Sequence, residues 1–184
     1  HLVKPWFHRM VADLLRFNRD ALTLLRAGGE GPALGHWLQE RRYSRALKQR
    51  NALLKQGGPS RMLDTWDHEL AEAGEPLTSR RQHYLERLQS RTIALAEALA
   101  PQLGIVGLNL SPGWRRHEVP LADALLLARD RDRQAGYTSL GPHRADWSVV
   151  FQSIPGRDAL SRGQAKLTAL ACLLAQAEDY AEQR

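Results

Sequence analysis

The stretch Leu160-Ser161-Arg162-Gly163-Gln164 lies where the last apolar segment of the chain begins. Leu167, Leu170 and Leu174 follow it at helical spacing, which predicts one helix from residue 161 to the end of the chain. The first N–H groups of a helix have no partners inside the helix and carry partial positive charge, so a helix start attracts anions. The position of this stretch therefore favours contact with a phosphate group.

Each polar residue of the stretch suits such a contact. Ser161 offers a hydroxyl, Gly163 lets the backbone approach a phosphate without a Cβ in the way, and Gln164 can donate to an oxygen. Arg162 and Lys166 add positive charge nearby. The same residues equally fit a simpler arrangement, in which Ser161 caps the helix and the glycine is incidental.

A second motif is Gly141-Pro142-His143-Arg144-Ala145-Asp146. The Gly-Pro pair predicts a turn, after which His143, Arg144 and Asp146 present two basic groups and an acid. This combination fits a catalytic or phosphate-sensing loop, and it also fits a turn that is closed by its own ion pair.

The remaining chain is predicted to be mainly α with a small β component. Helical or alternating apolar spacing predicts helices over residues 6–26, 34–55, 61–73, 79–99 and 120–134, and strands over 107–110 and 147–154. Ser79 and Gln82 form a capping-box pattern at the start of the fourth helix. Pro155 and Gly156 predict a hairpin-like turn, and the alternating charges of residues 129–133 predict a self-paired exposed face.

Composition and charge restrict the class of protein. With 43% hydrophobic and 25% charged residues, the 184-residue chain is typical of a soluble globular protein. No stretch reaches the roughly 18 apolar residues that a membrane helix needs, so we expect a cytoplasmic location and no membrane partner. The single cysteine, Cys172, excludes an internal disulfide and argues against a zinc site, and we assign no metal ligand and no catalytic residue.

An excess of basic residues points to an anionic partner. The net charge is +6 and the isoelectric point is near 10.0, which favours nucleic acid first. The helix predicted over residues 34–55 carries Arg45, Lys48, Arg50 and Lys55, which we assign as DNA contacts. A solvated helix face is the alternative explanation of these charges.

The two motifs, in this order and spacing, resemble the RecF family, which belongs to the wider group of ABC/SMC-like ATPases. The similarity covers about residues 45–184 and is carried by residues 45–55, 66–70, 129–134, 136–146, 160–166 and 173–176. It implies a helical arm over residues 45–104 and a partial ABC-type ATPase lobe over residues 105–184. Residues 1–44 form a separate N-terminal segment in this division.

The resemblance implies a recombinational DNA-repair and replication protein that binds DNA at single-strand gaps and duplex junctions and works with RecO and RecR. The complete family member binds ATP with magnesium and dimerises upon it. By this match, residues 160–166 are a signature loop that contacts, in trans, the ATP held by a second subunit. Ser161, Arg162, Gly163, Gln164 and Lys166 would make that contact. The turn with Gly141, His143, Arg144 and Asp146 would lie near the nucleotide or the DNA.

The chain departs from the family pattern in the parts that hold ATP. The phosphate-binding pattern G-x-x-x-x-G-K-[S/T] is absent from the sequence, and so is a strand ending in paired aspartates for magnesium. We therefore expect no ATP hydrolysis and no bound cofactor from this chain alone.

Residues 1–44 do not resemble the RecF family. Trp6-Phe7-His8-Arg9-Met10 and residues 15–19 and 31–38 look like the substrate-side region of flavin-dependent amine-oxidase-like proteins, and the apparent join is near Tyr43-Ser44-Arg45. A chimera or a divergent arm would explain this. Two alternative functions follow: a fragment of a flavin-dependent oxidoreductase, and a helical interaction or DNA-binding module without a nucleotide role. No dinucleotide-binding glycine pattern is present, so we expect no bound flavin.

If the basic helix contacts DNA, the affinity of the chain for DNA should fall steeply with salt, because neutralising phosphates releases counterions. Titration of a labelled oligonucleotide at several salt concentrations measures this slope. We expect little base preference, since no base-reading motif is evident. An affinity that does not change with salt, or no binding, would contradict the assignment.

Overall fold

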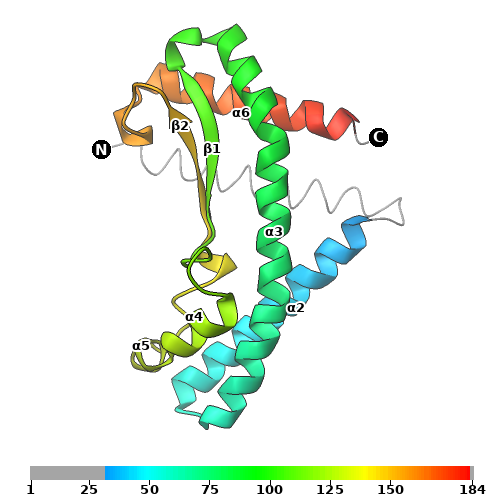
Figure 1. The fold of residues 1–184 in the computed structure, drawn as a ribbon, viewed down its shortest axis with the longest axis vertical. Helices are drawn as coiled ribbons and strands as arrows, with labels where there is room; N and C mark the ends of the chain where they lie inside the picture. The colour runs from blue at the N-terminus through cyan, green and yellow to red at the C-terminus, as the bar shows by residue number, and fades with distance from the viewer. Residues whose placement is uncertain (1–31, 183–184) are drawn as a thin grey trace. The chain divides into compact units, whose positions relative to one another are not determined.

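A computed structural model describes residues 32–182 of the chain and the side chains of residues 38–182. This part is mainly helical with one small sheet, as the sequence predicts (Figure 1). The helix predicted over residues 6–26, and the flavoenzyme-like motifs up to residue 31, lie outside the described residues.

The first two described helices form a hairpin. Helix α2 (Pro32–Gln56) ends before Gly57, and α3 (Ser60–Leu99) starts three residues later. The prediction of a helix over residues 34–55 is confirmed. Helix α2 continues without a break through residues 43–45, where the sequence analysis places a join between two families. Tyr43 is buried at this point and contributes to a hydrophobic core.

Helix α3 is one helix of 40 residues, so the prediction of two helices with a break between residues 73 and 79 is wrong. The start of the second helix was inferred from the capping pattern at Ser79 and Gln82. Pro76 lacks an N–H and so removes one backbone hydrogen bond, but the flanking residues Ala73 and Leu77 are buried in the core. Packing outweighs the local breaker here. Ser79 caps no helix; its Oγ accepts a 2.7 Å hydrogen bond from Arg116.

A two-stranded antiparallel sheet follows the short 3-10 helix η1 (Pro101–Leu103). Strand β1 (Ile105–Ser111) pairs with β2 (Asp146–Phe151), and the backbone bond from the Gln152 N–H to the Gly104 carbonyl, 2.7 Å long, extends the ladder. In both strands exposed residues alternate with buried or partly buried ones, so the two predicted strands are confirmed with shifted ends. Residues 155–156 lead to the 3-10 helix η3 (Arg157–Ala159), and no third strand follows within residues 32–182, so a hairpin does not form there.

The helix predicted over residues 120–134 is divided into α4 (Leu121–Leu127) and α5 (Arg129–Ala135), which meet at Ala128. The 3-10 helix η2 (Pro142–Arg144) forms the predicted Gly-Pro turn. Helix α6 (Arg162–Glu182) confirms the predicted C-terminal helix over the described residues. Its buried face consists mostly of small residues, among them Ala165, Ala169, Cys172 and Ala175.

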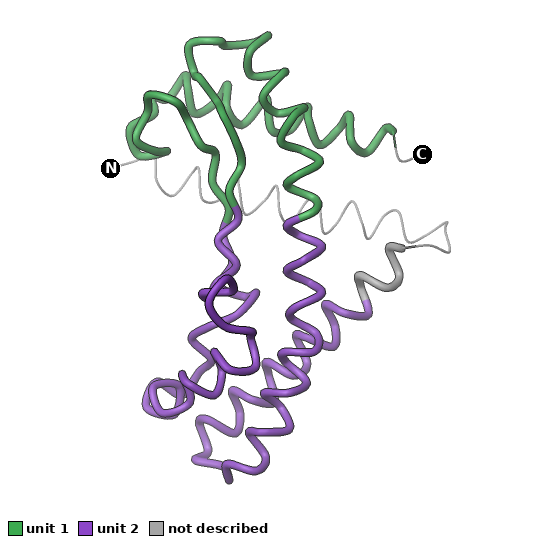
Figure 2. The backbone as a smooth tube through the Cα atoms, in the orientation of Figure 1, with its two compact units in different colours: residues 1–29, 83–109, 147–184 green, residues 30–82, 110–146 purple. Residues whose placement is uncertain are grey.

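The chain forms two compact units, each built from separate stretches of sequence (Figure 2). Among the described residues, unit 1 consists of His83–Asn109 and the stretch from Trp147 onward, and unit 2 consists of the stretch up to Gln82 and Leu110–Asp146. Unit 1 has a core around Leu103, Ile105 and Phe151. The core of unit 2 contains Tyr43, Leu70, Leu77, Trp114 and Leu121. These units differ from the predicted linear division into residues 45–104 and 105–184.

Gly74 marks the closest approach in the core of unit 2. A Cβ added at this position would lie 2.5 Å from Leu121 Cδ2 and 3.2 Å from both Pro142 Cγ and Tyr43 Cε2. We therefore expect Gly74→Ala to lower the free energy of unfolding by about 1–3 kcal/mol, as overpacking does, although alanine favours helices. Urea denaturation measures this change. The exposed helical glycine Gly163 meets no comparable obstacle and serves as the control. Equal or greater stability of Gly74→Ala would contradict the packing argument.

Candidate functional site

The start of α6 is capped by a reciprocal pair of hydrogen bonds. The Gln164 N–H donates to Ser161 Oγ over 3.2 Å, and the Ser161 N–H donates to Gln164 Oε1 over 2.8 Å. This is a capping box, in which the serine and the glutamine each accept from the other's backbone. The simpler of the two predicted arrangements is therefore present, and Gln164 takes part in it.

The capped helix start remains open to solvent. Ser161, Arg162, Gly163 and Lys166 are exposed, while Leu160 is buried directly before them. A Cβ added at Gly163 would meet nothing closer than Ser161 Oγ at 4.0 Å. Internal packing therefore does not require a glycine here, and an approach from outside the chain is compatible with the geometry.

The turn after α5 is held by a partly buried histidine. His143 Nε2 lies 3.0 Å from the Thr138 carbonyl, and the Tyr43 hydroxyl lies 2.7 Å from His143 Nδ1. Because a carbonyl can only accept, Nε2 carries the proton, and neutral Nδ1 accepts from the tyrosine. Burial lowers the pKa of His143 and raises the pKa of Tyr43. This environment favours the neutral form of His143, whereas the sequence analysis expected a basic group at this position.

The other members of this turn have different environments. Arg144 is exposed and its guanidinium lies 5.3 Å from the centre of the Tyr137 ring, while Asp146 is exposed at the start of β2. Gly141 is buried with a φ of +124°, and a Cβ there would lie 2.9 Å from the Tyr43 hydroxyl. The turn thus needs glycine at 141 and presents Arg144 to solvent.

Arg50 is fully buried, so its assignment as a DNA contact is wrong. Its side chain has 0% exposure and forms ion pairs with Asp67 and with Asp132, the latter at 2.7 Å. Arg50 also donates to Thr138 Oγ1 over 2.9 Å. Two carboxylates compensate the buried guanidinium, which therefore cannot reach a DNA phosphate.

The alternating charges of residues 129–133 do not form a self-paired exposed face. Asp132 is completely buried, and besides Arg50 it accepts a 3.0 Å hydrogen bond from the Ser139 N–H. Arg129 pairs with Asp64 at 2.8 Å and with Asp67 at 2.6 Å, both from α3. The run therefore joins α5 to other elements of unit 2, because its residues find partners distant in sequence.

The three other predicted DNA contacts, Arg45, Lys48 and Lys55, are exposed on α2. They lie in unit 2, as does the turn, whereas the capped start of α6 lies in unit 1. Within residues 32–182 no cluster of three possible metal ligands occurs. None of the described helices combines the length and the apolar character that crossing a membrane would require.

Some residues that define this geometry were not singled out from the sequence. Asn51 Oδ1 accepts from both the Thr138 N–H and the Thr138 hydroxyl, at 2.8 and 2.7 Å. Arg81 donates to the Pro142 carbonyl over 2.7 Å. Arg50 and Asn51 follow Tyr43 by seven and eight residues, or about two helical turns, so all three lie on the same side of α2. This spacing was the signal in the sequence that could have identified Asn51.

Known proteins resemble most of this chain. "DNA replication and repair protein RecF" of Stenotrophomonas maltophilia (strain R551-3) is 90% identical over 144 residues, which are 78% of this chain and 40% of that protein. The protein of the same name from Xanthomonas euvesicatoria pv. vesicatoria (strain 85-10) is 75% identical over 144 residues, 39% of its length. Over these 144 residues the chain is similar to part of the RecF proteins. The RecF protein of Aliivibrio fischeri (strain MJ11) is more distant, at 40% identity over 141 residues.

The chain spans about two fifths of the length of the RecF proteins that it matches. No protein-family model matches it. Among solved structures, that of the recombination mediator protein RecF-ATP in the RecFOR pathway matches with a TM-score of 0.67 and 23% sequence identity. The match covers 78% of this chain and 41% of the RecF chain in that structure. The RecF-ATPrS structure of the same pathway has a TM-score of 0.71, 24% identity and coverages of 80% and 43%. The fold is therefore that of part of RecF.

We expect Arg50→Met to lower the free energy of unfolding by about 3–5 kcal/mol, because Asp67 and Asp132 would remain buried without their cation. Arg45→Met, on the exposed face of the same helix, should change it by less than about 0.5 kcal/mol. Chemical denaturation of both variants measures the contrast. Similar stability of the two variants would show that the buried ion pairs do not support unit 2.

Proposed function

We propose that this chain is the arm and signature segment of a RecF-type recombination mediator, a protein of DNA replication and repair that binds DNA and, when complete, ATP. The observation that carries the proposal is the exposed, serine-capped start of α6 in a chain 90% identical to a RecF protein over 144 residues. The two roles are assigned to different units, ATP contact to unit 1 and DNA contact to unit 2.

The nucleotide contact is proposed to act in trans. The sequence contains no Walker lysine loop, so the triphosphate and its magnesium ion would be held by another part of the complete protein. The first-turn N–H groups of α6, including those of Arg162 and Gly163, point out of the helix start without partners inside the helix. The Ser161 hydroxyl can donate its hydrogen outward while its oxygen accepts from Gln164.

Charge supports the same contact. Arg162 and Lys166 are exposed next to the capped start, where they would offset the charge of a terminal phosphate. The amide Nε2 of Gln164 is a further donor, since its Oε1 is the atom that accepts from Ser161. Closure of such a loop on ATP held by a second copy would make dimer formation depend on the nucleotide.

The DNA contact is proposed for the exposed face of α2. Arg45, Lys48 and Lys55 supply the positive charge, and exposed Arg144 adds a cation on the turn, next to His143, which Tyr43 contacts. Single-strand gaps and duplex junctions are the proposed DNA structures. RecO and RecR are the proposed protein partners, because the similar solved structures are described as RecF of the RecFOR pathway. A cytoplasmic location follows from this function.

A helical interaction or DNA-binding module without a nucleotide role is the second candidate. The observation that favours it is the closed Ser161–Gln164 capping box, which accounts for both residues without a ligand. In that case a large side chain at position 161 would affect helix capping alone.

Replacing Ser161 separates these two functions. In the complete Stenotrophomonas RecF protein carrying the matching segment of this chain, Ser161→Arg should weaken ATP-dependent dimerisation at least about ten-fold, a loss of about 1.4 kcal/mol, because the side chain would occupy the phosphate position. Light scattering with and without ATP measures the dimer. Ser90→Arg, at an exposed position of unit 1, is the matched control and should dimerise normally.

ATP binding to the monomer should be unchanged in both variants, because the loop acts on nucleotide held by the other subunit. Dimerisation of the Ser161→Arg protein equal to that of the control would favour the module without a nucleotide role.

A further inference from the structure

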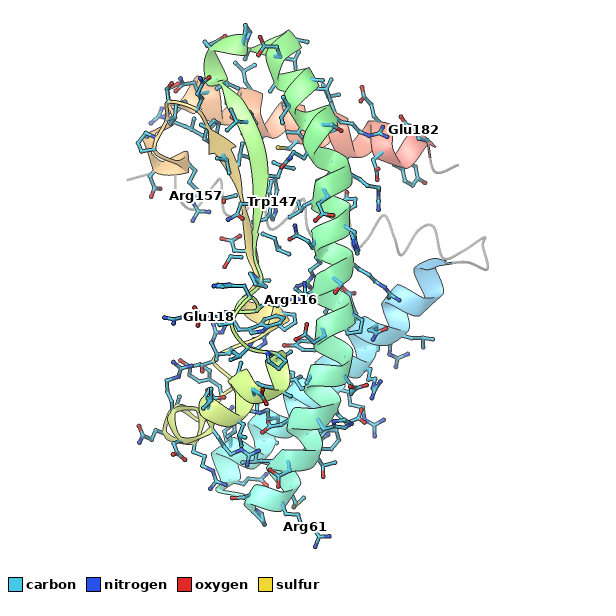
Figure 3. The ribbon with its side chains drawn as sticks, in the orientation of Figure 1. Arg61, Arg116, Glu118, Trp147, Arg157 and Glu182 are labelled. Carbon is cyan, nitrogen blue, oxygen red and sulfur yellow. The ribbon has the colours of Figure 1, made fainter. Side chains whose placement is uncertain are left out.

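Two arginines of α3 hold the C-terminal end of α6, entirely within unit 1. Arg87 donates from Nε and Nη2 to the two carboxylate oxygens of Asp179, over 3.3 and 3.2 Å. Arg91, one helical turn further along α3, donates from Nη1 to Glu182 Oε1 over 2.6 Å and from Nη2 to Glu182 Oε2. Figure 3 labels Glu182 at this end of the helix. In each pair, two nitrogens of one guanidinium therefore meet both oxygens of a carboxylate.

The two pairs differ in their exposure to solvent. The Asp179 side chain is 7% exposed, whereas that of Glu182 is 66% exposed. Water screens an exposed ion pair, so the pair of Arg91 with Glu182 contributes little net strength. Arg87 is half-exposed but its partner Asp179 is buried, and two parallel N–H bonds to one carboxylate restrict the angle as well as the distance. The pair of Arg87 with Asp179 is therefore a directional contact between α3 and α6.

The apolar contacts of α6 define its orientation less closely. Its buried face consists mostly of small side chains, and Ala165 and Ala171 pack in the same core as Ala96 of α3. Burial of such residues holds two helices together. Alanine, however, has no long side chain that could insert between its neighbours and fix a crossing angle. The rotation and tilt of α6 then depend on contacts with defined geometry.

The nucleotide contact proposed for Ser161 depends on this orientation. Helix α6 begins at Arg162, which is about 25 Å along the helix from Asp179. Over that length, a tilt of about 5° at Asp179 displaces the helix start by about 2 Å. A displacement of this size removes hydrogen bonds to a phosphate, because the nitrogen and oxygen of such a bond lie only about 2.7–3.2 Å apart. A fixed far end therefore favours productive contact at the helix start.

We propose that Arg87 and Asp179 are positioning residues for the nucleotide contact: their ion pair sets the direction in which Ser161 and the first N–H groups of α6 face. This inference rests on the proposed function of the α6 start and adds to it a requirement for a residue of α3. The alternative is a purely structural pair, which stabilises unit 1 without directing the helix start. Orientation and stability therefore have to be measured separately.

The orientation of α6 is measured in the full 184-residue chain. Nitroxide labels are attached after Ser90→Cys and Lys166→Cys substitution, at two exposed positions of unit 1, and pulsed electron paramagnetic resonance gives the distribution of distances between them. Native Cys172 is buried, which raises the pKa of its thiol to about 12 and protects it from labelling. The chain with Arg87 intact should give one narrow distribution.

Two substitutions of Arg87 test its role in this orientation. Arg87→Gln removes the cation and should broaden the distribution. Arg87→Lys keeps the charge but cannot form the two parallel bonds, so it should give an intermediate width, and it decides the matter if circular dichroism shows Arg87→Gln to be unfolded. Glu178→Gln removes a carboxylate from the neighbouring, exposed position of α6 and should leave the distribution narrow. Narrow distributions in both Arg87 variants, whatever their stability in urea, would overturn the proposal.

The consequence for the nucleotide contact is measured in the complete Stenotrophomonas RecF protein carrying the matching segment of this chain. Arg87→Gln should weaken ATP-dependent dimerisation at least about five-fold, the lower end of the usual coupling between distant sites. ATP binding to the monomer should be unchanged, because the loop acts on nucleotide held by the other subunit. Glu178→Gln is the matched control and should dimerise normally.

Ser161→Arg in the same protein separates the two proposals. If it weakens dimerisation whereas Arg87→Gln does not, the nucleotide contact stands and the positioning role of Arg87 is wrong. If neither variant weakens dimerisation, the proposed nucleotide function fails, and the positioning role fails with it. Weaker dimerisation of Arg87→Gln without a broader label distribution would show that Arg87 does not act through the orientation of α6, which also overturns the proposal.

Discussion

The ion pairs of the buried Arg50 guanidinium with Asp67 and Asp132 hold unit 2 together. A buried cation is costly unless it is matched, and here α2 supplies the cation while α3 and α5 each supply a carboxylate. The same guanidinium donates to Thr138, so the segment after α5 is joined to the hairpin. Neighbouring positions of α2 extend this arrangement, with Asn51 accepting from the Thr138 backbone and Tyr43 donating to His143. The turn that follows is therefore fixed from beneath, and its outer surface remains available to a partner.

The two family motifs obtain their order in different ways. The turn around Gly141 depends on long-range contacts, and His143 at its centre is held by hydrogen-bond partners on either side of its ring, Tyr43 and the Thr138 carbonyl. The start of α6 depends on contacts between residues three positions apart, in which Ser161 and Gln164 cap one another. A local cap leaves the outward N–H groups exposed, which suits a loop that must close on a ligand held by another subunit. A motif fixed by buried contacts suits a rigid surface, as the proposed DNA contact requires.

Local patterns in the sequence predicted what depends on neighbouring residues. Helices α2 and α6 and both strands follow from apolar spacing, and the family was identified from motif order. The continuous helix α3 was missed because Ser79 and Gln82 match a local capping pattern, whereas the burial of Ala73 and Leu77, which favours one unbroken helix, is a tertiary effect. Arg50 was taken for a DNA contact for the same reason, because its partners Asp67 and Asp132 are distant in sequence. Basic residues on a helix carry no local sign of which one faces inward.

Hydrogen exchange at two backbone amides tests this account most directly. The N–H groups of Thr138 and Ser139 lie outside any helix or strand, and they donate to Asn51 and Asp132. If these contacts join the segment to the hairpin, both amides should exchange as slowly as the interior amides of α2, since they open only when unit 2 unfolds. Exchange at the rate of an exposed loop would show that the segment moves independently, and would contradict the central role of the buried Arg50 ion pairs.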